Sequence, residues 1–116
     1  MITNQSGNMK KIYLAIPYSG MEESSFEQAT QTTFDLMNTN KNLNVFSPIT
    51  HSHPLAKLGL SGSWDYWEQL DYQFIDWADE IYVVIPKEGI NKIIQSKGVQ
   101  AEIAYAEKKN KLITYL

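Results

Sequence analysis

Cysteine and arginine are both absent from this sequence of 116 residues. Without cysteine the chain can form no disulfide, no thiolate metal site and no cysteine nucleophile, which fits a reducing compartment. Without arginine it has no guanidinium group for a bidentate contact with phosphate. Any phosphate must therefore be bound by the ten lysines, by hydroxyl groups or by backbone amides.

Three longer patterns are missing as well. No hydrophobic run approaches the length of a membrane span, and the N-terminus lacks the apolar core of a signal peptide. The Gly-x-Gly-x-x-Gly fingerprint of a dinucleotide cofactor does not occur. These absences predict a cytoplasmic protein that has no cofactor and makes no contact with a membrane.

Composition and charge narrow the class of protein further. The chain is long enough for one domain, and its apolar fraction of 43% is ordinary for a globular fold. Its net charge of −3 argues against binding to a nucleic-acid backbone, which normally requires a basic face. We expect residues 1–10 to be a flexible polar leader and residues 11–116 to form the domain.

Short apolar runs alternate with helical patterns along this domain. We expect strands at residues 11–16, 43–46, 80–85 and 112–115, and helices at about 24–38, at 64–78 and around Glu102. Residues 49–63 show no clear periodicity and are expected to form a long loop. The alternation predicts a small three-layer flavodoxin-like or Rossmann-like α/β domain with a parallel sheet of about four strands. In such a sheet the ligand crevice lies at the carboxyl ends of the strands.

Glu102 is a single carboxylate in the first turns of the last predicted helix. Val99, Ile103 and Ala106 recur there at helical spacing, which puts Glu102 beside the face that packs inward. Burial of an ionised group costs several kcal/mol unless the group is paired or used. We expect the helix N-terminus to hold Glu102 ionised, as a nucleophile requires. The alternative is a partly exposed carboxylate that only favours the helix dipole.

Asp71 lies at the margin of an apolar stripe on the helix expected at residues 64–78. Desolvation at this margin is expected to raise the pKa of its carboxyl group. Two carboxyl groups from different elements that meet at one pocket are typical of glycosidic-bond chemistry, where one attacks the anomeric carbon and the other handles a proton. The alternative is a solvated aspartate on the helix surface.

Five further residues are candidates for contact with a ligand. Tyr18 and Ser19 follow the first strand, where a ligand-facing loop begins. His51 and His53 stand two residues apart, which is a poor spacing for zinc, so we predict no metal site. We expect both to form hydrogen bonds that shape the pocket or order the long loop. Trp64 offers an aromatic face on which a nucleobase can stack.

Four segments carry a resemblance to a known family. They read Ile-Tyr-Leu-Ala-x-Pro-Tyr-Ser at 12–19, Val-Phe-Ser-Pro-Ile-x-His-Ser-His-Pro at 45–54, Leu-Asp-x-x-Phe-Ile-Asp-x-Ala-Asp at 70–79 and Ser-x-Gly-Val-x-x-Glu-Ile at 96–103. Together they resemble a small uncharacterised bacterial and phage family (DUF1937-like). That family is similar to the nucleoside 2-deoxyribosyltransferases and the deoxynucleoside monophosphate N-glycosidases. The resemblance covers residues 11–116.

The resemblance implies roles for several of these residues. Glu102 matches the nucleophile, which forms a covalent deoxyribosyl intermediate, and Asp71 matches the acid near the sugar and the base. Tyr18 matches the residue that orients the nucleophile. Ser96 and Gly98 match a loop that contacts the 5′-phosphate in the nucleotide-cleaving branch. The known transferases complete their pocket from a neighbouring subunit, so the resemblance also implies a homo-oligomer, a dimer or larger.

The chain departs from that pattern at two places. The nucleotide glycosidases use an arginine in the first loop, and this chain has none, which weighs against a preference for a 5′-phosphate. Residues 87–95 also form a longer segment than in the best-known transferases.

These observations predict an enzyme that acts on the N-glycosidic bond of a nucleoside or nucleotide, by deoxyribosyl transfer or hydrolysis, with Glu102 as its nucleophile. A module that binds nucleotides without turnover is a second hypothesis, because a fold does not fix a function. A structural or partner-binding protein is a third, and it would be favoured if Glu102 and Asp71 lay far apart with no pocket between them.

Overall fold

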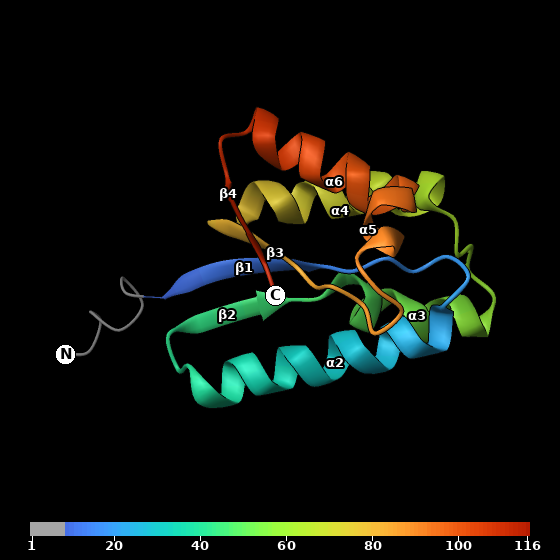
Figure 1. Ribbon diagram of the computed structural model, residues 1–116, viewed down its shortest axis with the longest axis horizontal. Helices are drawn as coiled ribbons and strands as arrows, with labels where there is room; N and C mark the ends of the chain where they lie inside the picture. The colour runs from blue at the N-terminus through green and yellow to red at the C-terminus, as the bar shows by residue number, and fades with distance from the viewer. Residues whose placement is uncertain (1–8) are drawn as a thin grey trace.

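Four parallel strands form the centre of the protein, in the order β2-β1-β3-β4 (Figure 1). The computed structural model describes residues 9–116, so the predicted leader lies almost entirely outside the described residues. The strands are β1 (Lys10–Ala15), β2 (Leu43–Phe46), β3 (Glu80–Val83) and β4 (Leu112–Tyr115). All four were predicted within a residue or two, and their parallel pairing is confirmed.

Helices cover both faces of this sheet, which confirms the predicted three-layer α/β fold. Helices α2 (Glu22–Thr39) and α3 (Pro48–Leu58) lie on one face, below the sheet in Figure 1. Helices α4 (Trp64–Trp77) and α6 (Lys97–Lys108) lie side by side on the other face, next to the short helix α5 (Asn91–Gln95). No helix of residues 9–116 is long and apolar enough to cross a membrane.

Strand β1 is buried on both faces, as its nearly continuous apolar sequence predicts for a central parallel strand. Leu14 packs on the side of α2, in a cluster with Ala29. Tyr13 and Ala15 belong to the core that also contains residues of α4 and α6. The alternation of side chains along the strand therefore points Tyr13, the one polar side chain among residues 12–16, into the layer between the sheet and those two helices.

Helix α3 occupies most of the segment that was predicted to be a long loop, residues 49–63, and that prediction was wrong. The helix has strong local signals: the Ser47 hydroxyl caps it by accepting a hydrogen bond from the Thr50 amide at 3.3 Å, and Pro48 stands in its first turn. Pro54 lies inside the helix and removes one internal hydrogen bond. This interior proline hid the helical pattern.

Two smaller boundaries also differ from the expectation. Helix α2 begins at Glu22, two residues before the expected start, and has no side-chain cap. Ser25 lies inside the helix, where its buried hydroxyl donates a hydrogen bond to the carbonyl of Pro17. Helix α5 forms in the segment between β3 and α6, where the sequence predicts no helix or strand.

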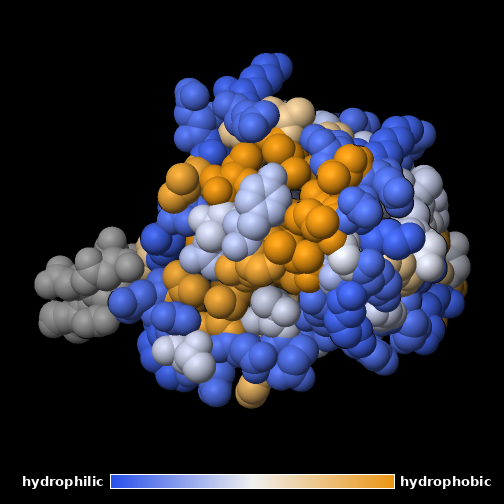
Figure 2. Space-filling view, viewed as in Figure 1, coloured by the Kyte–Doolittle hydropathy of each residue, from blue (hydrophilic) through white to orange (hydrophobic). Residues whose placement is uncertain are grey.

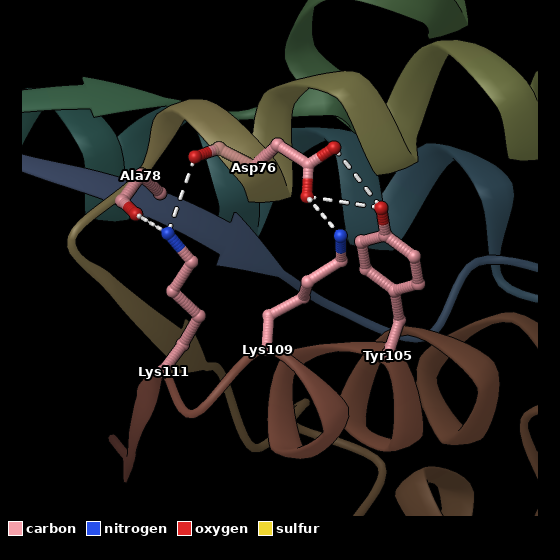
Figure 3. A network of polar contacts seen from close by, with 5 residues as sticks. All are labelled: Asp76, Ala78, Tyr105, Lys109 and Lys111. Atoms are coloured by element: carbon pink, nitrogen blue, oxygen red, sulfur yellow. Dashed lines mark hydrogen bonds and ion pairs between the residues drawn. The ribbon is translucent and has the colours of Figure 1, made fainter.

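Polar contacts fasten the C-terminal end of α4 to the C-terminal end of α6 (Figure 3). The Tyr105 hydroxyl contacts both carboxylate oxygens of Asp76, at 2.9 and 3.0 Å, and the Lys109 ammonium lies 3.7 Å from the same group. Lys111 donates to the main-chain carbonyls of Asp76 at 3.2 Å and of Ala78 at 2.7 Å. These bonds satisfy carbonyls at the end of α4 and hold the two helices in a fixed relative position.

Strand β4 forms one edge of the sheet and carries an apolar surface. Figure 2, viewed from the same side as Figure 1, shows hydrophobic side chains gathered on the face where β4 and the C-terminus lie. The exposed apolar residues of this strand and the residue after it are Leu112, Tyr115 and Leu116. This surface is called the β4 edge below.

Candidate active site

A cavity of about 530 Å³ lies at the carboxyl end of β1. Strand β1 has β2 on one side and β3 on the other, so the chain changes direction here, and open α/β sheets bind ligands at such a point. Eight of the nine predicted site residues line the cavity: Tyr18, Ser19, His53, Trp64, Asp71, Ser96, Gly98 and Glu102. Segments that are far apart in the sequence thus meet at one site.

His51 is the predicted site residue that does not line the cavity. It is exposed, and its ring lies against Phe46 and edge-on to Trp67. Its Nδ1 lies 3.3 Å from the Ser52 hydroxyl, so this histidine forms a hydrogen bond within its own segment. The helical form of α3 explains why the two histidines differ. Two residues that stand two positions apart on a helix point in nearly opposite directions, so only His53 faces the cavity.

Glu102 is a buried carboxyl group, 5% exposed, and its Oε2 accepts a hydrogen bond from the Tyr13 hydroxyl. The resemblance assigned the contact with this carboxyl group to Tyr18, but the Tyr18 hydroxyl pairs with His53 instead. Sequence reasoning missed Tyr13, which reads as one more large residue of a buried strand. Its signal was a single hydroxyl group in an otherwise apolar run, because a buried hydroxyl needs a partner.

Asp71 is buried to the same extent on the inward face of α4. Among the side-chain atoms of residues 9–116, its Oδ1 is the one buried nitrogen or oxygen that has no hydrogen-bond partner. Such an atom normally costs a folded protein free energy, so native structures rarely contain one without a use. Asp71 also lines the cavity, so a carboxyl group with an unsatisfied oxygen lies in the wall of the site.

The two carboxyl groups hold their protons unusually tightly. Burial raises the pKa of Asp71 to about 7, although the Tyr13 hydroxyl offsets part of this rise. Burial, with the charge of Asp71, raises the pKa of Glu102 to about 8, again against the effect of Tyr13. Burial and the two carboxylates also raise the pKa of Tyr13, so it stays a donor. The expected rise for Asp71 is confirmed.

The expectation that the helix N-terminus holds Glu102 ionised was wrong in direction. Glu102 stands in the second turn of α6, beyond the first turn in which the dipole acts most strongly. Its desolvation therefore outweighs the dipole. In the free protein at neutral pH the carboxyl pair carries a proton, and the two groups titrate together.

The loop that enters α6 has a structural explanation of its own. The Ser96 hydroxyl caps the helix by accepting a hydrogen bond from the Val99 amide at 3.1 Å. A Cβ atom at Gly98 would lie 3.3 Å from the Trp64 ring, so glycine allows the indole to lie close against the helix. Trp64 is held from another side by Tyr72, edge-on at 5.7 Å between ring centroids.

Cations lie near the rim rather than in the depth of the cavity. Lys92 and Lys97 are both exposed, and the Lys97 ammonium lies 3.4 Å from the carboxylate of Asp65. Within the described part of the chain, no three His, Cys, Asp or Glu side chains gather in the manner of metal ligands.

The fold and the site together define a class: a small three-layer α/β domain with a carboxylate pair in a cavity at the carboxyl edge of its parallel sheet. Residues 10–116 match the family described as Domain of unknown function (DUF1937), and the chain belongs to that family. No curated protein matches the chain. The predicted DUF1937-like membership is confirmed, and the further similarity to deoxyribosyltransferases stays a prediction.

The raised pKa of Glu102 predicts how stability depends on pH. Between the ordinary value of 4.5 and the folded-state value of about 8, the folded protein retains a proton that the unfolded chain releases. The free energy of unfolding should therefore fall as pH rises through this range. Glu102→Gln cannot ionise, so it should match the wild type at about pH 4 and exceed it by at least ~1 kcal/mol at about pH 9.

Urea unfolding at a series of pH values measures this difference. Glu107→Gln is the matched control, because Glu107 is an exposed glutamate on the same helix. A Glu102→Gln curve that runs parallel to the wild-type curve across the whole pH range would contradict the prediction.

Proposed function

We propose that this protein breaks or exchanges the N-glycosidic bond of a nucleoside or nucleotide. The observation that carries the proposal is the pair of buried carboxyl groups, Glu102 and Asp71, which line one cavity. Two carboxyl groups with raised pKa values at one cavity suit an acid and a nucleophile that work together. The hydrogen bond from Tyr13 to Glu102 supports the nucleophile assignment, because it favours the anionic form of that group.

The proposed reaction has two steps. Glu102 Oε attacks C1′ of the sugar while the bond from C1′ to the base nitrogen breaks, and its electron pair leaves with the base, which takes a proton from Asp71. Water or a second base then attacks C1′ and releases the Glu102 carboxylate. The attacking water or base gives up a proton in this step, and Asp71 accepts it. The proton returns to Asp71 at the end of each cycle, so no redox partner is required.

The cavity has properties that fit a nucleoside-sized ligand. Its volume of about 530 Å³ lies within the usual range for small-molecule sites, ~300–1,000 Å³. Its wall includes the residue Trp64, whose ring can stack on a base, and Asp71, whose carboxyl group can form a hydrogen bond. The rim lysines are the charged groups nearest to a phosphate, in place of the missing arginine.

The hypothesis of a purely structural role loses its supporting observation, because Glu102 and Asp71 line the same cavity. A module that binds without turnover shares every feature named above. Assays for product and for binding separate it from an enzyme.

Loss of the nucleophile should abolish the reaction. Glu102→Ala should lower the rate of base release or exchange at least ~1,000-fold, and Asp71→Asn should lower it ~100- to 10,000-fold. The assay incubates the protein with a panel of nucleosides and nucleotides, with and without an added free base, and detects released or exchanged base by chromatography.

Glu107→Ala is the control for this assay, because Glu107 is exposed on the same helix and should retain full activity. Full base release by Glu102→Ala would overturn the proposal. Tight binding of a nucleotide in calorimetry, with no product after long incubation, would favour the binding module.

The shared proton predicts a bell-shaped pH profile. The reaction needs Glu102 ionised and Asp71 protonated, and the singly protonated pair is most populated between the pKa values of about 7 and about 8. Because Glu102 has the higher pKa, the proton of this pair lies mainly on Glu102, and the reactive form is the less populated of the two arrangements. We expect kcat/KM to be highest in that interval and to fall on both sides. A profile that is flat from about pH 6 to about pH 9 would contradict this assignment.

The expected homo-oligomer and the cytoplasmic location stay predictions. The β4 edge supports an oligomer, because among residues 9–116 no strand pairs with the outer side of β4 and no charged residue lies between Leu112 and Leu116. Strand edges of this kind readily pair with another chain. Light scattering should give the mass of a dimer or a larger assembly. A monomer mass at all accessible concentrations would contradict the expectation.

A further inference from the structure

A chain of hydrogen bonds runs from the cavity wall to the protein surface, and the proposed reaction does not use it. The Tyr18 hydroxyl contacts His53 Nδ1 at 2.7 Å, and His53 Nε2 contacts Glu23 Oε1 at 3.1 Å. Tyr18 and His53 line the cavity, whereas the Glu23 side chain is 60% exposed. The three residues come from the loop after β1, from α3 and from α2, so these hydrogen bonds form only when the tertiary fold brings the three segments together.

The imidazole ring of His53 is fixed in its orientation. It is 5% exposed, it stacks on Phe26 at 4.7 Å between ring centroids, and it meets the Tyr18 ring edge-on at 5.7 Å. Glu23, in turn, lies 3.7 Å from the ammonium group of Lys57. Each nitrogen of the ring is therefore directed at one defined partner.

The partners decide which nitrogen carries the hydrogen. A carboxylate only accepts hydrogen bonds, so His53 Nε2 must donate to Glu23. In a neutral imidazole the other nitrogen is an acceptor, so the Tyr18 hydroxyl donates to Nδ1. Burial, with the charges of Glu22 and Glu23, raises the pKa of Tyr18, so the hydroxyl keeps the proton that it donates.

We propose that Tyr18 determines specificity by accepting a hydrogen bond from a hydroxyl or amino group of the ligand. Its single proton is committed to His53, so its oxygen has only lone pairs to offer to the cavity. This inference rests on the proposed function, since it takes the ligand to be a nucleoside, and it names a recognition contact within that site.

The same geometry disfavours a phosphate group at this position. Phosphate oxygens only accept hydrogen bonds, and the carboxylates of Glu22 and Glu23 lie near Tyr18. A ligand with a hydroxyl group here gains a hydrogen bond, and an analogue that lacks this group covers the acceptor oxygen without pairing it. Tyr18 thus selects for a donor on the ligand and against an acceptor.

The first experiment needs no ligand. The chain has two histidines, so the His51→Gln variant, labelled with ¹⁵N-histidine, reports on His53 alone. We expect NMR at about pH 7.5 to show a hydrogen on Nε2 and none on Nδ1. A hydrogen on Nδ1, in the other tautomer or in an imidazolium ion, would overturn the inference.

The second experiment measures specificity by calorimetry, with Glu102→Gln present in every protein so that no turnover occurs. The ligands are 2′-deoxynucleosides and analogues that lack the 3′-hydroxyl, the 5′-hydroxyl or the amino group of the base. With Tyr18 present, one analogue should bind ~3- to 10-fold more weakly than its parent. Tyr18→Phe should bind that analogue and its parent equally.

Matched variants separate the contact from a general effect. Tyr115→Phe removes an exposed hydroxyl outside the cavity and should leave discrimination unchanged. Glu23→Ala removes the partner that sets the tautomer and should reduce discrimination, whereas Glu27→Ala, on the same exposed side of α2, should not.

The outcomes distinguish the two proposals. If the protein with Tyr18 binds none of the nucleosides, the proposed function fails, and this inference fails with it. If it binds them and Tyr18→Phe discriminates among the analogues as well as the parent protein does, this inference alone is overturned.

Discussion

The burial of two carboxyl groups beside one phenol is the constraint on which the rest of this structure depends. Glu102 and Asp71 are removed from water in the layer between the sheet and its covering helices, and Tyr13 supplies a hydrogen bond there. Burial of such a pair is unfavourable, and it persists because the surrounding core holds it. The sheet contributes the phenol, and each of two helices contributes one acid, so the site exists only in the complete fold.

The relative position of α4 and α6 sets the distance between the two acids, and both ends of this helix pair are fixed. At one end, Tyr105 of α6 donates a hydrogen bond to the carboxylate of Asp76. Lys111, which follows α6, donates hydrogen bonds to the main-chain carbonyls of Asp76 and Ala78. At the other end, the absence of a side chain at Gly98 lets the Trp64 ring lie against α6. A site held between two such contacts can keep a strained electrostatic arrangement that a looser pair of helices would relax.

Much of this fold could be predicted from the sequence, because its strands are short apolar runs and α4 and α6 have clear periodicity. Helix α3 could not, since Pro54 interrupts the pattern and only the tertiary structure shows that the helix continues through it. That error carried over to the site, where His51 was expected beside His53. The role of Tyr13 could not be derived either, because its partner is 89 positions away in the chain.

The unpartnered oxygen of Asp71 has a consequence for how ligands could be found. A molecule that donates a hydrogen bond to this oxygen removes a penalty from the folded state, and the unfolded chain gains nothing from it. Binding there should therefore raise the melting temperature by more than the size of the molecule alone would suggest. The melting temperature of the protein, measured with each member of a library of small molecules, would then identify the molecules that form this hydrogen bond. The screen needs no assumption about the reaction.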